Sequence, residues 1–119
     1  AADAEAMADR ITAAIRRMGV DPNALLPRSR VQEAAEAFAA RDPERARQIV
    51  RRVAPAAVRS VWRRGISDGG LRADSERYVR AYARLLEDHG RDGPAILAAL
   101  GSDAGRAFLL LDAAVGDLG

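Results

Sequence analysis

Proline limits how this chain can fold more than any other residue, because its five prolines divide a helix-rich sequence into short segments. Asp21-Pro22 and Asp42-Pro43 each place a capping carboxylate before a proline, which is the favoured order of N-cap and first helical residue. Pro55 and Pro94 are expected to open helices as well, and Pro27 closes a short turn. The prolines therefore predict several helices joined by sharp corners.

The segments between these corners are helical in composition and in periodicity. Alanine, arginine, leucine and glutamate favour helix, and no window alternates apolar and polar residues as a half-buried strand does. Apolar side chains recur at spacings of three and four instead, and Ser29 to Gln32 fits a capping box at one helix start. The helices predicted in this way span residues 3–18, 29–40, 43–53, 55–65, 71–89, 94–100 and 103–115.

The fold class that follows is all-α, an irregular multi-helix bundle of about five main helices with short proline-marked connections. A length of 119 residues is typical of one domain, so we expect a single helical domain over residues 1–119. A loop at 67–70 is the place where it could subdivide. The chain begins without Met, so we expect it to be excised from a longer protein. Its use of arginine without lysine is typical of a bacterial source.

The residues that are missing exclude several kinds of site. Without cysteine the chain has no disulfide, thiolate metal site or cysteine nucleophile, and its lone histidine, His89, cannot supply a histidine pair. No stretch reaches the roughly 20 apolar residues of a membrane-spanning helix. We expect a cytoplasmic protein that is not an enzyme and has no cofactor, metal or evident small-molecule substrate. The enzymatic alternative needs a pocket around His89, Tyr78 and Tyr82, although the tyrosine spacing is more typical of a helical core.

Paired arginines follow two apolar residues in three places, at 14–18, 49–53 and 61–65. In the second and third copies a further arginine precedes the pair in the same register. At about 100° per residue, these arginines lie on the helix side opposite the apolar residues. Two consecutive helices are therefore expected to carry one outer face of three arginines each, formed by Arg47, Arg51, Arg52, Arg59, Arg63 and Arg64.

The basic charge of the chain is concentrated in this middle segment. Residues 41–64 hold eight arginines and two acids, whereas residues 1–40 and 65–119 each carry more acids than arginines. A local excess of this kind attracts phosphate backbones and acidic proteins. Each arginine pair also falls in the last turn of its helix, where cations complement the helix dipole without any ligand.

Three interpretations of the arginine faces therefore stay open: solvated helix-end charges, contact with an acidic protein or with the acidic C-terminal half, and contact with nucleic acid. A helix-turn-helix can be drawn from residues 43–53 and 55–64 for the last of these. Its turn consists of Ala54 alone and lacks the glycine that the motif often has.

The last predicted helix is apolar on more than one side. One apolar stripe recurs at helical spacing from Ala104 to Val115, and Leu109 and Leu110 point away from it. Such a helix is either central in a bundle or covered by a partner. We expect a partner or self-association face at these two leucines.

The function expected from these features is a non-catalytic protein-interaction or scaffolding domain of a larger bacterial cytoplasmic protein. The expected partner is a protein, either a different one or a second copy of this chain. The alternative is a nucleic-acid-binding helical domain that uses the arginine-rich segment 41–64.

Overall fold

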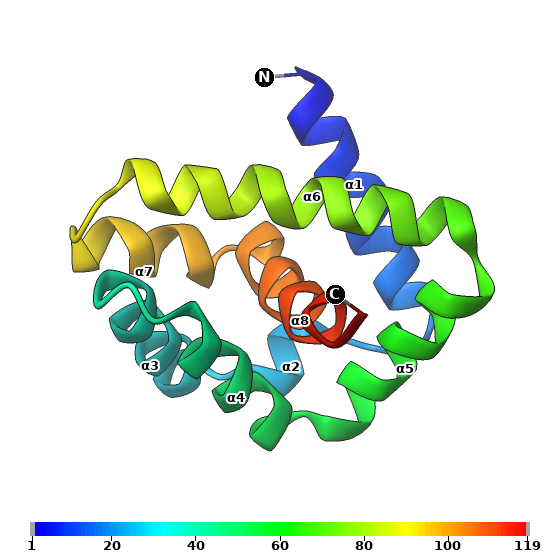
Figure 1. Cartoon of the computed structure of the whole chain (residues 1–119), viewed down its shortest axis with the longest axis horizontal. Coiled ribbons are helices and arrows are strands. Elements are labelled where there is room, and N and C mark those ends of the chain that lie inside the picture. The colour runs from blue at the N-terminus through cyan, green and yellow to red at the C-terminus, as the bar shows by residue number, and fades with distance from the viewer. Residues whose placement is uncertain (1, 119) are drawn as a thin grey trace.

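A computed structural model describes residues 2–118 of the chain and the side chains of residues 6–116. This part of the chain contains eight helices and no strand (Figure 1). The all-α class is confirmed, but the expected count of about five main helices is too low. Even the short segments after Pro22 and Gly93 are helical, because a capping aspartate and a proline preset their first turns. The helices are α1 (Ala2–Arg17), α2 (Pro22–Leu25), α3 (Arg28–Ala39), α4 (Pro43–Val53), α5 (Pro55–Ser67), α6 (Gly69–Asp88), α7 (Gly93–Gly101) and α8 (Asp103–Leu118).

Aspartate side chains cap the N-termini of α2, α4, α6 and α7. The two Asp-Pro caps predicted from the sequence are confirmed. The capping box predicted at Ser29 is wrong, because α3 already begins at Arg28 and the extended Pro27 is its N-cap. Each capping carboxylate accepts a hydrogen bond from a first-turn amide: Asp21 from Asn23 at 3.1 Å, Asp42 from Arg45 at 3.2 Å, Asp68 from Leu71 at 3.1 Å and Asp92 from Ala95 at 3.1 Å.

Asp68 is the joint between α5 and α6, so the loop predicted at 67–70 is reduced to one residue. Asp68→Ala is expected to lower the free energy of unfolding by about 1 kcal/mol, because a first-turn amide of α6 loses its acceptor. Urea denaturation followed by circular dichroism measures the loss. Asp68→Asn keeps an accepting oxygen and should lose roughly half as much or less. Equal losses for both variants would contradict a capping role.

Helix α8 lies at the centre of the molecule, with α6 on one side of it and α4 and α5 on the other (Figure 1). It contacts α1, α2, α4, α5, α6 and α7, so helices from both sides of residue 68 share one core. Leu109 and Leu110 are 2% and 0% exposed. The prediction that they form a partner or self-association face is therefore wrong, because neighbouring helices of the same chain bury both side chains.

Two tyrosines of α6 hold the corner where α7 and α8 meet at 90°. The Tyr78 hydroxyl donates to the carbonyl oxygen of Ala104 at 2.8 Å, and the Tyr82 hydroxyl donates to that of Ala99 at 2.7 Å. Burial raises the pKa of both hydroxyls above its ordinary value. Both side chains are thus core residues whose polar ends are satisfied inside the fold.

Candidate functional site

The six arginines of the predicted basic face fall into two groups. Arg52, Arg59, Arg63 and Arg64 are exposed, whereas Arg47 and Arg51 are half-buried against α8. The prediction of a triple outer face on α4 is therefore wrong for these two. Each follows a buried residue of α4 by one position, about 100° around the helix, so it stands at the flank of the buried stripe. A long arginine side chain can reach the neighbouring helix from there.

Arg47 and Arg51 tie α4 to α8 through a cluster of charge-assisted hydrogen bonds. Arg47 Nε donates to Asp112 Oδ2 at 3.1 Å, and its Nη1 donates to Glu44 Oε2 at 3.1 Å. Arg51 donates from Nε and Nη2 to the carbonyl oxygen of Ala113 at 3.2 and 3.0 Å, and from Nη1 to Glu44 Oε1 at 3.3 Å. The acidic C-terminal half thus does pair with part of the arginine-rich segment.

Asp112 is the buried member of this cluster, with 6% of its side chain exposed. Burial raises the pKa of this carboxyl, and the Arg47 guanidinium opposes the rise. Burial also pulls the pKa of Arg47 down, but Asp112 and Glu44 together outweigh it and raise that pKa. A hydrogen bond from Arg47 lowers the pKa of the exposed Glu44. The sequence reasoning missed Asp112, although a lone acid inside the apolar run 109–114 is a signal of a buried ion pair.

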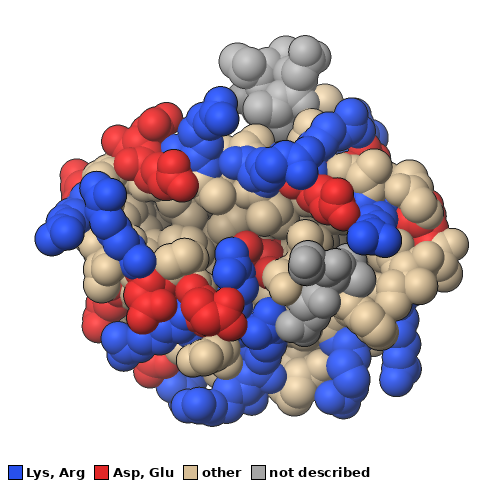
Figure 2. Space-filling view, in the orientation of Figure 1, with Lys and Arg blue, Asp and Glu red and all other residues tan. Residues whose placement is uncertain are grey.

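The four exposed arginines lie on α4 and α5. In the part of the chain that the structure describes, none of them has an ion-pair partner. Figure 2 shows basic side chains along the lower edge of the molecule, over these two helices, with few acidic ones between them. Ile66 is 54% exposed and follows Arg59 and Arg63 at spacings of seven and three, so the three share one side of α5. We call the surface formed by Arg52 of α4 and by Arg59, Arg63 and Ile66 of α5 the arginine face, and it combines charge with an apolar contact. Arg64, two positions before Ile66, is exposed on the other side of α5.

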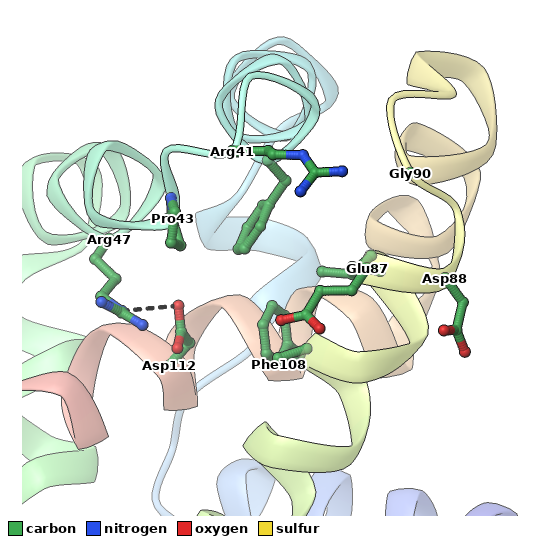
Figure 3. A pocket seen from close by; sticks show the side chains of 11 residues that line it. Arg41, Pro43, Arg47, Glu87, Asp88, Gly90, Phe108 and Asp112 are labelled. Atoms are coloured by element: carbon green, nitrogen blue, oxygen red, sulfur yellow. Dashed lines mark hydrogen bonds and ion pairs between the residues drawn. The ribbon is translucent and has the colours of Figure 1, made fainter.

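A cavity of about 640 Å³ opens between the α3–α4 corner, the C-terminal end of α6 and α8 (Figure 3). No sequence pattern predicted it. Its floor is apolar, formed by Phe38, Ala83, Leu86 and Phe108, and the Phe38 and Phe108 rings lie 5.8 Å apart between centroids. Figure 3 shows Arg41 above Phe108, the Arg47–Asp112 pair at one end, and Glu87 and Asp88 on the α6 side.

Arg41 stands at the rim of this cavity in a backbone conformation that favours glycine, with φ at 60°. Its N–H donates to the carbonyl of Phe38 at 3.0 Å, and that of Asp42 donates to Ala37 at 2.8 Å. This pair of bonds ends helices at a left-handed residue, which is usually glycine because a Cβ costs about 1 kcal/mol there. Strain of this kind clusters at binding sites. The Arg41 side chain forms no ion pair with any described residue.

Of the residues named for an enzymatic alternative, Tyr78 and Tyr82 pack against each other with ring centroids 5.8 Å apart, but they form no pocket with His89. His89 is exposed at the C-cap of α6, and none of His89, Tyr78 and Tyr82 lines the cavity. Within the described residues, no three histidine, aspartate or glutamate side chains are grouped closely enough to hold a metal ion.

Comparisons of the chain with protein-family models, with curated proteins and with solved structures found no match in any of the three. No single helix of the described chain is long and apolar enough to cross a membrane, and one bent pair, α7 with residues 103–116, passes that test by length and composition alone. Function is therefore argued from the arginine face and the cavity.

Proposed function

We propose that this chain is a non-catalytic protein-interaction domain that binds an acidic, amphipathic helical segment of a partner on the arginine face. The observation that carries the proposal is that four arginines on α4 and α5 are exposed and unpaired among the described residues, and that two of them, Arg59 and Arg63, share one side of α5 with the exposed Ile66. Carboxylates on one side of a helix can meet guanidinium groups spaced by one turn.

Ile66 favours a protein partner over nucleic acid. Its side chain lies in line with Arg59 and Arg63, and an amphipathic helix can cover it with an apolar residue while its acids meet the arginines. A phosphate backbone offers no such apolar contact. Single-strand binding usually relies on exposed aromatic rings for base stacking, and the one tryptophan, Trp62, is half-buried with its Nε1 fully enclosed.

The nucleic-acid alternative rests on the same four arginines and the local charge of segment 41–64. It differs in what it predicts: phosphate binding falls steeply with salt and does not depend on an apolar side chain. A titration that varies the salt and changes Ile66 therefore separates the two functions.

Arg59→Gln/Arg63→Gln is expected to weaken binding of a fluorescent acidic amphipathic peptide about fivefold to tenfold, because two exposed charge contacts are lost. Ile66→Ser should weaken it about fivefold, since a partly buried apolar contact is lost. Fluorescence anisotropy measures both effects, with a mixed single strand and a mixed duplex as competing probes. Arg80→Gln/Arg84→Gln removes the same charge from exposed positions of α6 and should leave peptide binding unchanged.

Tighter binding of DNA or RNA than of the peptide, unaffected by Ile66→Ser, would establish the nucleic-acid alternative instead. Absence of binding to every probe at low salt would remove the arginine face as a functional surface.

A further inference from the structure

We propose that the cavity between the α3–α4 corner, α6 and α8 binds a small zwitterionic molecule whose ammonium and carboxylate groups are separated by a flat apolar body. Asp112 receives the ammonium group, Arg41 receives the carboxylate, and the phenylalanine floor receives the body. The proposal does not depend on the arginine face, which uses other residues.

The ammonium end is assigned from the hydrogen bonding of Asp112. Arg47 occupies its Oδ2, and no described residue donates to its Oδ1. Among the described side chains, Trp62 Nε1 is the one polar atom that is fully buried and has no hydrogen-bond partner. Because Asp112 Oδ1 also has no partner, it cannot be fully buried and is accessible. Asp112 lines the cavity. A carboxylate oxygen with no donor in a largely buried side chain is a strong acceptor for an ammonium group.

The carboxylate end is assigned from Arg41. A left-handed position that favours glycine carries an arginine instead, and the guanidinium of that arginine stands at the cavity rim without an ion-pair partner among the described residues. Figure 3 shows Arg41 above Phe108 and Asp112 beside it, so the two charged groups face a ligand from different sides of the apolar floor. Guanidinium groups bind carboxylates with two parallel hydrogen bonds.

The body of the ligand is assigned from the lining. Phe38 and Phe108 present tilted rings, and Ala83 and Leu86 add aliphatic surface from α6. The volume of about 640 Å³ lies within the usual range of small-molecule sites. Figure 2 shows the same region as a hollow with an uncharged floor and charged side chains around it.

Three probes of one shape test the proposal on the full chain: para-(aminomethyl)benzoate, which carries both charges, para-methylbenzylamine, which is a cation, and para-methylbenzoate, which is an anion. Amide chemical shifts of the lining residues, followed by NMR, give the affinities. The zwitterion is expected to bind with a Kd on the order of 1 mM, as suits a ligand of this size. Each singly charged probe should bind about tenfold more weakly, because one charged hydrogen bond is lost.

Arg41→Gly provides the sharpest variant, because relief of backbone strain should raise the urea midpoint while binding of the zwitterion and the anion falls about tenfold. Asp112→Asn should weaken the zwitterion and the cation but not the anion. Asp9→Asn makes the same chemical change at an exposed position of α1 outside the cavity lining and should leave all three affinities unchanged. If Asp112→Asn does not fold, the probe series and Arg41→Gly still decide the question.

Three results would overturn the proposal. The first is an equal affinity of the zwitterion and either singly charged probe for the wild-type chain. The second is unchanged binding of the zwitterion to Arg41→Gly. The third is the absence of shifts at the lining residues with every probe at about ten times the expected Kd.

Discussion

Gly105→Ala should cost the protein at least about 3 kcal/mol of unfolding free energy, or prevent it from folding. Gly105 lies in the first turns of α8, where that helix crosses the end of α7. A Cβ at this position would lie 2.1 Å from the carbonyl oxygen of Ala99 and 2.5 Å from Cα of Leu100. Both are backbone atoms that cannot rotate away, so α7 and α8 would have to separate. Leu100, which is fully buried, would lose its packing.

Urea denaturation of Gly105→Ala, followed by circular dichroism, measures this loss, and Gly101→Ala is the matched control. Gly101 ends α7, and nothing lies within 4 Å of a Cβ built there. The same change at Gly101 should leave stability unchanged or raise it by up to about 1 kcal/mol, because alanine restricts the unfolded chain. Equal urea midpoints for the two variants would show that the α7–α8 contact is not as close as the structure has it.

Arg47→Met should lower the free energy of unfolding by about 3 kcal/mol, because it leaves the buried Asp112 carboxylate without its guanidinium partner. The side chain of Arg47 is 28% exposed, so water partly screens the interaction between the two charges. The expected loss of stability is therefore near the lower end of the range for buried ion pairs. Arg47→Met/Asp112→Leu removes both charges and should recover most of the loss. A double-mutant cycle from chemical denaturation gives the coupling energy. Additive single losses would contradict a direct interaction.

The pH dependence of stability tests the environment of Asp112. Because burial raises its pKa in the folded state above the ordinary value of 3.8, the folded protein holds this proton more tightly than the unfolded chain does. Stability of the wild type relative to Asp112→Asn should therefore increase as the pH falls through the window between the raised pKa and 3.8, and should level off below it. A decrease over the same window would mean that Arg47 outweighs burial and holds the pKa below its ordinary value.

Much of the local structure could be predicted from the sequence, because its causes lie within a few residues. Asp42 and Pro43 set the first turn of α4 wherever that helix packs, and α4 has the predicted bounds of 43–53. Two local predictions failed because a neighbouring residue sets the helix boundary. Pro27 is the N-cap of α3, so this helix begins before Ser29, and Asp68 alone connects α5 to α6 where a loop was expected.

The candidate sites could be predicted only in part. Arg59 and Arg63 of α5 are opposite its buried residues, as helical periodicity requires, whereas Arg64 stands at the flank of the buried stripe. The other half of the arginine segment was misassigned because periodicity gives the direction of a side chain and not its reach, and Arg47 extends to an acid 65 residues away. The cavity is lined by residues from the α3–α4 corner, α6 and α8. Apart from Asp112, none of these residues stands out in the sequence of its own segment, so the sequence gives no signal of the cavity.

The sequence by itself determined the helical class, most helix boundaries and the concentration of arginine in the middle of the chain, since propensity, capping and charge are local properties. Only the tertiary structure decided that Leu109 and Leu110 are core residues, that Arg47 and Arg51 are bound to α8, and that Arg41 and Asp112 face one cavity. These outcomes depend on which helices cover each side of α8, and that arrangement is fixed by packing between segments far apart in the chain.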